Sequence, residues 1–290
     1  MTSRLPPLLE LYLRLPPETS LILLTNVLGA STNWLVQRYL CSFLASSSTS
    51  SQRDGSATKE AGETGEDDEV SVILVSFLRD HAFWKEGAGR LGIDLDGLSR
   101  RGRFVFVDGL SGLFTPPGGL KSKPSAGGGG AGTRVLSGAT VQELRKELNE
   151  AVTGLRVTRP DSKIMLVLDG PDLLLAASGK TISGLVLQEI LLDIREKVHS
   201  SIVTLSADEP LISAQTTMLE KEHAAFTLSL AHEAEMVISL RMLDTGTARD
   251  VSGVLRVTHG GNATGTLVEE RELLYFVGGD GGVRVFERGQ

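Results

Sequence analysis

Short apolar runs recur along the first two thirds of the chain and alternate with longer stretches of helical period. Each run is continuous rather than alternating with polar residues, which is typical of strands buried on both faces of a parallel sheet. Strands are predicted at 21–25, 71–77, 103–109, 163–170 and 201–206.

Helices are predicted between these strands. The first covers 34–44, and Asp80 is expected to cap the next at its N-terminus. Thr140 and Glu143 have the spacing of a capping box ahead of a third. Further helices are predicted at 181–199 and 216–232.

From residue 235 on, apolar segments follow one another without gaps long enough for a helix, which predicts antiparallel strands. The repeated strand–helix units before them favour a parallel sheet with right-handed connections. The expected fold class is therefore α/β: a mostly parallel twisted sheet flanked by helices, with C-terminal antiparallel strands.

Two segments depart from this pattern, and both are predicted to be disordered insertions in a single domain spanning 1–290. Residues 45–69 are rich in serine and acids, carrying seven carboxylates against two cations. Residues 115–133 are rich in glycine and proline, which lack the restraint or the donors of regular structure. The formal net charge of -7 therefore resides mostly in the first insertion.

Composition narrows the cellular setting. Cys41 is the single cysteine of the 290 residues, so no intrachain disulfide can form, which suits a reducing compartment. No apolar run approaches the roughly 18 residues of a membrane span. Cytoplasm and nucleus are the expected locations, with no membrane association.

The loop after the first strand stands where a nucleotide-binding protein holds phosphate. A phosphate loop reads G-x-x-x-x-G-K-[ST], in which the lysine balances phosphate charge and the hydroxyl binds Mg²⁺. In that register this chain has Leu24 for the first glycine and Ala30 for the lysine, while Gly29 and Ser31 remain. A methyl group cannot balance a triphosphate, so a strand-to-helix turn without a cofactor is the expected reading.

Other candidates for chemistry are weak. Asp169 ends its strand like a Walker B carboxylate, but Asp108 does the same, and acids often end parallel strands. His232 and Glu233 begin a zinc-binding pattern whose second histidine is replaced by Met236. No catalytic residue and no metal site are predicted.

Three features together resemble the RecA/KaiC class of ring ATPases: the degenerate loop, the segment 75–95 and the aspartate-ended strand. In that class the strand at 71–77 is followed by catalytic carboxylates. Here Leu78 and Arg79 follow it. The group that orients the attacking water is therefore missing as well as the lysine.

A narrower resemblance covers nearly the whole chain. It rests on VSFLRDHAFWKEGAGRLGIDL, FVFVDGLSGLF, MLVLDGPDLLLA, SLAHEAEMVISLRMLDTGTARDVSGVLRVTHGG and ELLYFV. The sequence is similar to fungal members of the family of the sixth subunit of the Elongator complex. The resemblance implies a RecA-like fold without nucleotide motifs, in a hexameric ring with two copies each of Elongator subunits 4 and 5. That ring serves the machine that modifies the wobble uridine of tRNA.

The leading hypothesis is accordingly a non-catalytic structural subunit, with tRNA handled by the assembled ring. In such rings the former nucleotide cleft lies at the subunit boundary, so the loop and its neighbours are expected to line a protein interface. These interface candidates are Asn26, Leu28, Gly29, Ser31 and Arg79.

Candidate RNA contacts are Arg100, Arg101, Arg103 and Lys180. Two alternatives stay open: a self-sufficient RecA/KaiC-like ATPase with a diverged loop, and a binder of single-stranded nucleic acid. The missing lysine and carboxylates oppose the first, and the lack of an aromatic and basic groove weakens the second.

Overall fold

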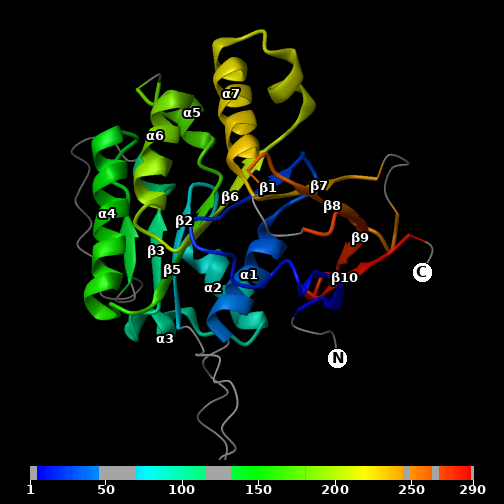
Figure 1. Cartoon of the computed structure of the whole chain (residues 1–290), viewed down its shortest axis with the longest axis horizontal. Coiled ribbons are helices and arrows are strands. Elements are labelled where there is room, and N and C mark those ends of the chain that lie inside the picture. The colour runs from blue at the N-terminus through cyan, green and yellow to red at the C-terminus, as the bar shows by residue number, and fades with distance from the viewer. Residues whose placement is uncertain are drawn as a thin grey trace, which may run out of the picture.

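A computed structural model describes residues 5–45, 69–114, 132–179, 181–243, 248–262 and 268–288. Within these residues, ten strands form one sheet in the order β10-β9-β8-β7-β1-β6-β5-β2-β3-β4 (Figure 1). The strands are β1 (Leu21–Asn26), β2 (Val70–Ser76), β3 (Phe104–Asp108), β4 (Thr133–Val135), β5 (Lys163–Asp169), β6 (Ser200–Ser206), β7 (Met236–Arg241), β8 (Gly253–His259), β9 (Arg271–Val277) and β10 (Val283–Phe286).

The sheet has a parallel and an antiparallel part. From β7 through β1 to β4, all neighbouring strands are parallel. β7, β8, β9 and β10 then pair antiparallel. The central strands are buried on both faces, whereas β7 and β9 alternate between buried and partly exposed residues. The predicted fold class is confirmed.

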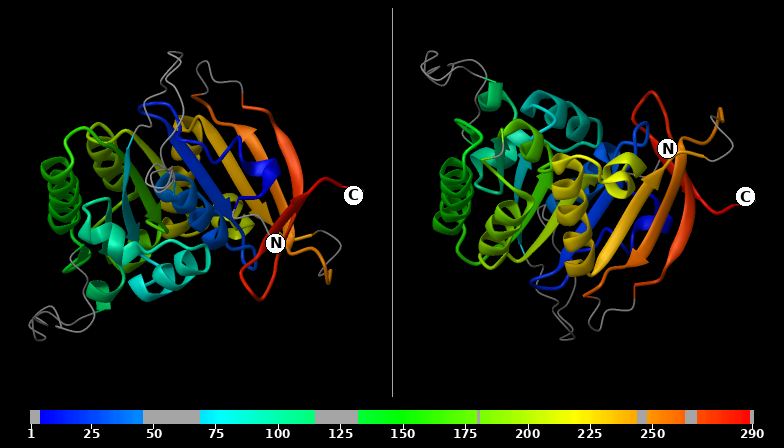
Figure 2. Two further views of the ribbon diagram at one scale, coloured as in Figure 1. Left: turned by 90° about the horizontal axis from the view of Figure 1, so that it is seen from below. Right: turned by 90° about the horizontal axis from the view of Figure 1, so that it is seen from above.

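Helices cover both faces of the parallel part (Figure 2). One face packs on α1 (Asn33–Ala45), α2 (His81–Arg90), α3 (Leu95–Arg100) and the N-terminal turn η1 (Pro7–Leu9). The other packs on α4 (Val141–Thr158), α5 (Leu173–Ala177), α6 (Gly184–Arg195) and α7 (Met218–Glu233). None of the helices in the described ranges is both long and apolar enough to cross a membrane.

Side-chain caps set where several helices begin. Asp80 accepts a hydrogen bond from the Phe83 amide at 2.9 Å, as predicted. Thr140 caps α4, but the reciprocal bond from the Glu143 side chain is not among those of the described residues, so the predicted capping box is half formed. The complete capping box starts α7, where Thr217 and Glu220 bond each other's backbone amides.

Several predicted boundaries shift. The helix expected at 181–199 is the shorter α6, which begins after its cap Ser183. Thr133, expected in the second insertion, begins the short strand β4 on the free side of β3. Ala45 ends α1, and the Glu69 carbonyl accepts from the Lys163 amide. The rest of both insertions, at 46–68 and 115–131, lies outside the described residues.

The carboxyl ends of the central strands meet at one edge. Asn26 lies opposite Ser206, and Asp169 lies opposite both Ser76 and Thr204. The chain leaves β1 through α1 on one face and leaves β6 through α7 on the other. Open α/β sheets bind ligands at the carboxyl ends of two adjacent strands whose following helices lie on opposite faces, as they do here.

Candidate functional site

The loop between β1 and α1 turns at Gly29, which has a φ of +90°. A Cβ there would lie 3.2 Å from the Met242 sulfur, so both backbone conformation and space favour glycine. Ala30, at the position of the phosphate-binding lysine, is buried. The strand-to-helix turn expected at this loop therefore uses Gly29 for its left-handed backbone conformation.

One backbone amide of this loop is hydrogen-bonded to a carboxylate of the same chain. The Leu28 N–H donates to Asp208 Oδ1 at 2.8 Å, and the neighbouring Ala207 amide bonds the Asn26 carbonyl. Amides of a phosphate loop point at phosphate oxygens. Here the carboxylate of Asp208, in the loop after β6, accepts the hydrogen bond that a phosphate oxygen would accept in a phosphate loop. Sequence reasoning missed this bond.

The loop presents an apolar side chain to solvent. The Leu28 side chain is 87% exposed, while its neighbour Ser31 is exposed and Asn26 is half-buried. Leu78, at the end of β2, is exposed at 40% and packs over Gly170, where a Cβ would lie 2.6 Å from Leu78 Cδ1. The edge where open α/β sheets bind ligands thus carries exposed leucines here.

Arg79 brings a cation to the same edge. Its amide donates to Ser76 Oγ at 3.0 Å, and its guanidinium donates to the Leu78 carbonyl at 2.8 Å. The guanidinium also lies 5.4 Å from the centre of the Phe83 ring, a cation–π distance. Arg79 is therefore held just after β2, at the position where the RecA/KaiC class has a catalytic carboxylate.

Asp169 is closed off from solvent. Its side chain accepts from Ser76 Oγ at 2.7 Å and from Thr204 Oγ1 at 3.0 Å, and the residue is 1% exposed. Burial raises the pKa of its carboxyl, and the two hydroxyl donors and the charge of Arg79 act against that rise. The Walker B resemblance is thus one of position, because both oxygens face hydroxyls of neighbouring strands instead of an open site.

The other acids near the edge have structural partners too. Asp108 accepts from the amides of Leu110 and Ser111, which closes its own turn. Asp172 lies 3.9 Å from the His223 ring and accepts from the Ser206 amide; burial raises the pKa of its carboxyl. Among the described residues, no three metal-ligating side chains gather.

The three arginines among the candidate RNA contacts do not join this edge. Arg100 and Arg101 are exposed near the start of β3, at the opposite edge of the sheet. Arg103 is buried, donating to the carbonyls of Val70 and Leu44, so its prediction as a surface contact is wrong. Lys180 lies outside the described residues.

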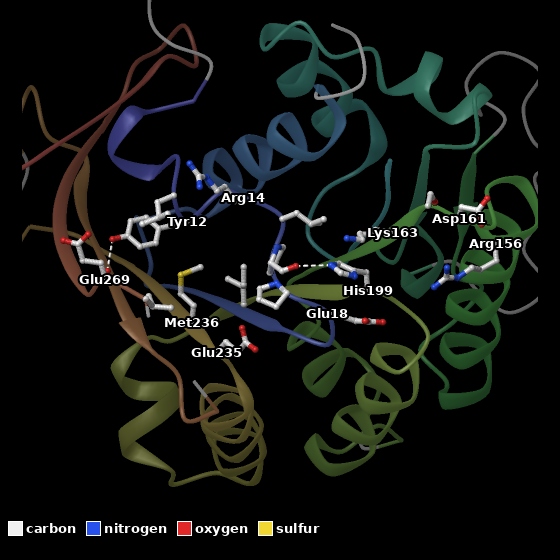
Figure 3. Close-up of a pocket in the computed structure, with 17 residues that line it drawn as sticks. Tyr12, Arg14, Glu18, Arg156, Asp161, Lys163, His199, Glu235, Met236 and Glu269 are labelled. Carbon is white, nitrogen blue, oxygen red and sulfur yellow. Dashed lines mark hydrogen bonds between the residues drawn. The ribbon is translucent and has the colours of Figure 1, made fainter. Parts of the chain in front are cut away.

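A large cavity also lies at that opposite edge. It has a volume of about 840 Å³ and opens between the N-terminal segment and the starts of β1, β5 and β7. Figure 3 shows charged groups of both signs around it, among them Arg156, Glu18 and Glu235. His199 is tied to the Pro16 carbonyl at 3.0 Å. Both cations and acids therefore line this cavity, which favours no single charge of ligand.

Comparison with known proteins shows what the chain is similar to. A family model described as Elongation complex protein 6 matches residues 68–277. The structure is similar to that of a KaiC-like protein from the hyperthermophilic archaeon Pyrococcus horikoshii OT3, with a TM-score of 0.55 and 13% identity over 99% of this chain and 98% of that one. At this identity the likeness shows the RecA-like fold alone. No curated protein sequence matches the chain.

Proposed function

Because the chain belongs to the Elongation complex protein 6 family, we propose that it is a non-catalytic subunit of a heteromeric RecA-like ring in the Elongator complex. The partners in this proposal are Elongator subunits 4 and 5, two copies each. The ring supports modification of the tRNA wobble uridine, in cytoplasm and nucleus. Family membership and fold support the coarser part, an Elongator subunit with a RecA-like fold.

One observation carries the structural role. The loop that would hold phosphate instead presents Leu28, 87% exposed, while Asp208 already bonds the amide behind it. Exposed leucines at a site built for a charged ligand are best accounted for by a protein neighbour. A leucine buried against a partner contributes about 1.5–3 kcal/mol.

The same edge favours assigning tRNA binding to the ring rather than to this chain alone. In addition to Arg79, this edge carries the carboxylates of Asp80, Asp172, Asp208 and Glu209. Acids in this number weaken the attraction for phosphate. In this proposal, tRNA binding therefore depends on cations from the other subunits of the ring.

Co-expression with subunits 4 and 5 tests the proposal. Leu28→Ser with Arg79→Glu removes the exposed leucine and reverses the cation, so this variant should be depleted from the purified ring at least about tenfold. Native mass spectrometry of the co-purified complex gives the subunit count.

The matched control carries the same changes at the opposite edge. Val157→Ser with Arg100→Glu alters a valine that is 80% exposed and an exposed arginine. This control should enter the ring normally. If the Leu28 and Arg79 variant also enters normally while both proteins fold by circular dichroism, this edge is not the interface.

A further inference from the structure

A second cavity lies between α1, α2 and the turn that joins β9 to β10. Its volume is about 330 Å³, and its lining includes Gln37 and Arg38 of α1, Glu86 and Arg90 of α2, and Asp280 with Gly281 of the turn. It is separate from the β1–α1 loop and from the cavity of Figure 3. We call it the α1–α2 cavity.

Arg38 is the unusual member of this lining. The residue is 2% exposed, and its Nη2 donates to the Gly281 carbonyl at 3.0 Å. Its Nε is buried and has no hydrogen-bond partner among the residues that the structure describes. Among the described residues no carboxylate lies within ion-pair distance of Arg38. A buried guanidinium without a counterion is costly, and an unmet buried donor adds to that cost.

The acids of the lining are engaged elsewhere. Glu86 pairs with Arg90 one turn along α2, at 2.6 Å. The exposed Asp280 accepts from the Gly282 amide at 2.9 Å and so holds the turn. Within the described part of the chain, the lining therefore leaves one positive charge, on Arg38, without a counterion.

Gln37 adds a neutral polar group to the wall. Its amide lies against α2, where a Cβ on Gly87 would come within 1.9 Å of Gln37 Nε2. Glycine at 87 thus makes the room in which this half-buried amide sits. An amide and a guanidinium from adjacent residues of α1 offer neutral and charged donors to one ligand.

We propose that the α1–α2 cavity binds a carboxylate group, with Arg38 as its charged donor. The carboxylate accepts from the guanidinium and supplies the negative charge that the interior lacks. A single charge fits better than the double charge of a phosphate monoester, because Glu86 and Asp280 repel a second one. The volume admits a small organic acid or an acidic side chain of another protein.

NMR of the isolated full chain tests this, so the result does not depend on ring assembly. The arginine Nε–H signals of the ¹⁵N-labelled protein are followed while sodium acetate replaces sodium chloride at constant ionic strength. The Arg38 signal, assigned by its loss in Arg38→Met, should shift saturably. A matched variant, Arg284→Gln, removes an exposed arginine of β10 and should leave this shift unchanged.

A second variant covers the case in which Arg38→Met does not fold. Gln37→Leu keeps the guanidinium and removes the amide, and it should weaken acetate binding several-fold. A linear, non-saturating shift in the wild type, or an unchanged affinity in Gln37→Leu together with a signal assigned elsewhere, overturns the proposal.

A second experiment, co-purification in the presence of acetate, distinguishes the two sources of the carboxylate. If it belongs to another Elongator subunit, acetate should reduce co-purification of that subunit with the wild-type chain, at concentrations that saturate the NMR shift. If it belongs to a free acid, co-purification should not respond to acetate. Both results require the saturable Arg38 shift.

Discussion

Two parts of the same sheet edge differ in how they use polar groups. Around Asp169, the hydroxyls of Ser76 and Thr204 close a buried network across three strands. In the β1–α1 loop, the Leu28 amide is held by Asp208 while its side chain stands in solvent. The first part is core, and the second is surface.

The difference shows which features of a nucleotide fold persist without its chemistry. A carboxylate at the end of β5 can serve the fold itself, because it ties three strand ends together. A lysine at position 30 would serve only the ligand, and there the chain has a buried alanine. Position alone therefore does not identify a catalytic carboxylate; its solvent access and its partners do.

Among the residues at this edge of the sheet, the largest effect is expected at Asp169. Asp169→Ala leaves the hydroxyls of Ser76 and Thr204 without their acceptor and opens space in the core. The free energy of unfolding should fall by about 2–4 kcal/mol, measured by urea denaturation. Asp169→Asn keeps the shape and one acceptor, so it should lose much less. Equal losses in both variants would mean that the charge, rather than the hydrogen bonds, matters.

The pH dependence sharpens the same test. Burial raises the pKa of Asp169 in the folded protein above its unfolded value. The folded protein then keeps this proton up to a higher pH than the unfolded chain does. The contribution of Asp169 to the free energy of unfolding therefore falls as the pH rises from the unfolded pKa to the folded pKa. Asp169→Asn cannot titrate and should lack that fall. A pH profile identical to wild type would contradict the raised pKa.

Much of the buried part could be predicted from the sequence. Continuous apolar runs located β2 and β5 with their faces, since a doubly buried strand must be apolar throughout. The short β4 was missed because three residues beside a glycine-rich segment have no period to detect. It forms because β3 offers it an unpaired edge.

Side-chain placement at the site was harder to predict. Asp208 is 180 positions from Leu28 along the chain, and only the pairing of β1 with β6 brings them together. Arg103 was predicted to be a surface cation, but a long side chain can be buried where backbone carbonyls accept its donors. Such contacts depend on the assembled sheet, which no local pattern records.

A moderate effect is expected at the loop turn. Gly29→Ala places a Cβ in a conformation with φ of +90° and close to the Met242 sulfur. Stability should fall by about 1–2 kcal/mol in urea denaturation. Gly154→Ala is the matched control, because Gly154 lies within α4 with no atom near its Cβ position, and it should be neutral or stabilising. A neutral Gly29→Ala would show that the turn is free to rearrange.

The smallest effect on stability should come from Leu28, and it decides the contrast between core and surface. Leu28→Ser removes a side chain that touches little in the isolated chain, so the free energy of unfolding should change by less than about 0.5 kcal/mol. Leu24→Ala, at a fully buried position of β1, should cost about 2–5 kcal/mol. A large loss for Leu28→Ser would place this leucine in the fold of the monomer, and the exposed surface would then need no neighbour. A negligible loss leaves its hydrophobic free energy available for a contact that the isolated chain does not make.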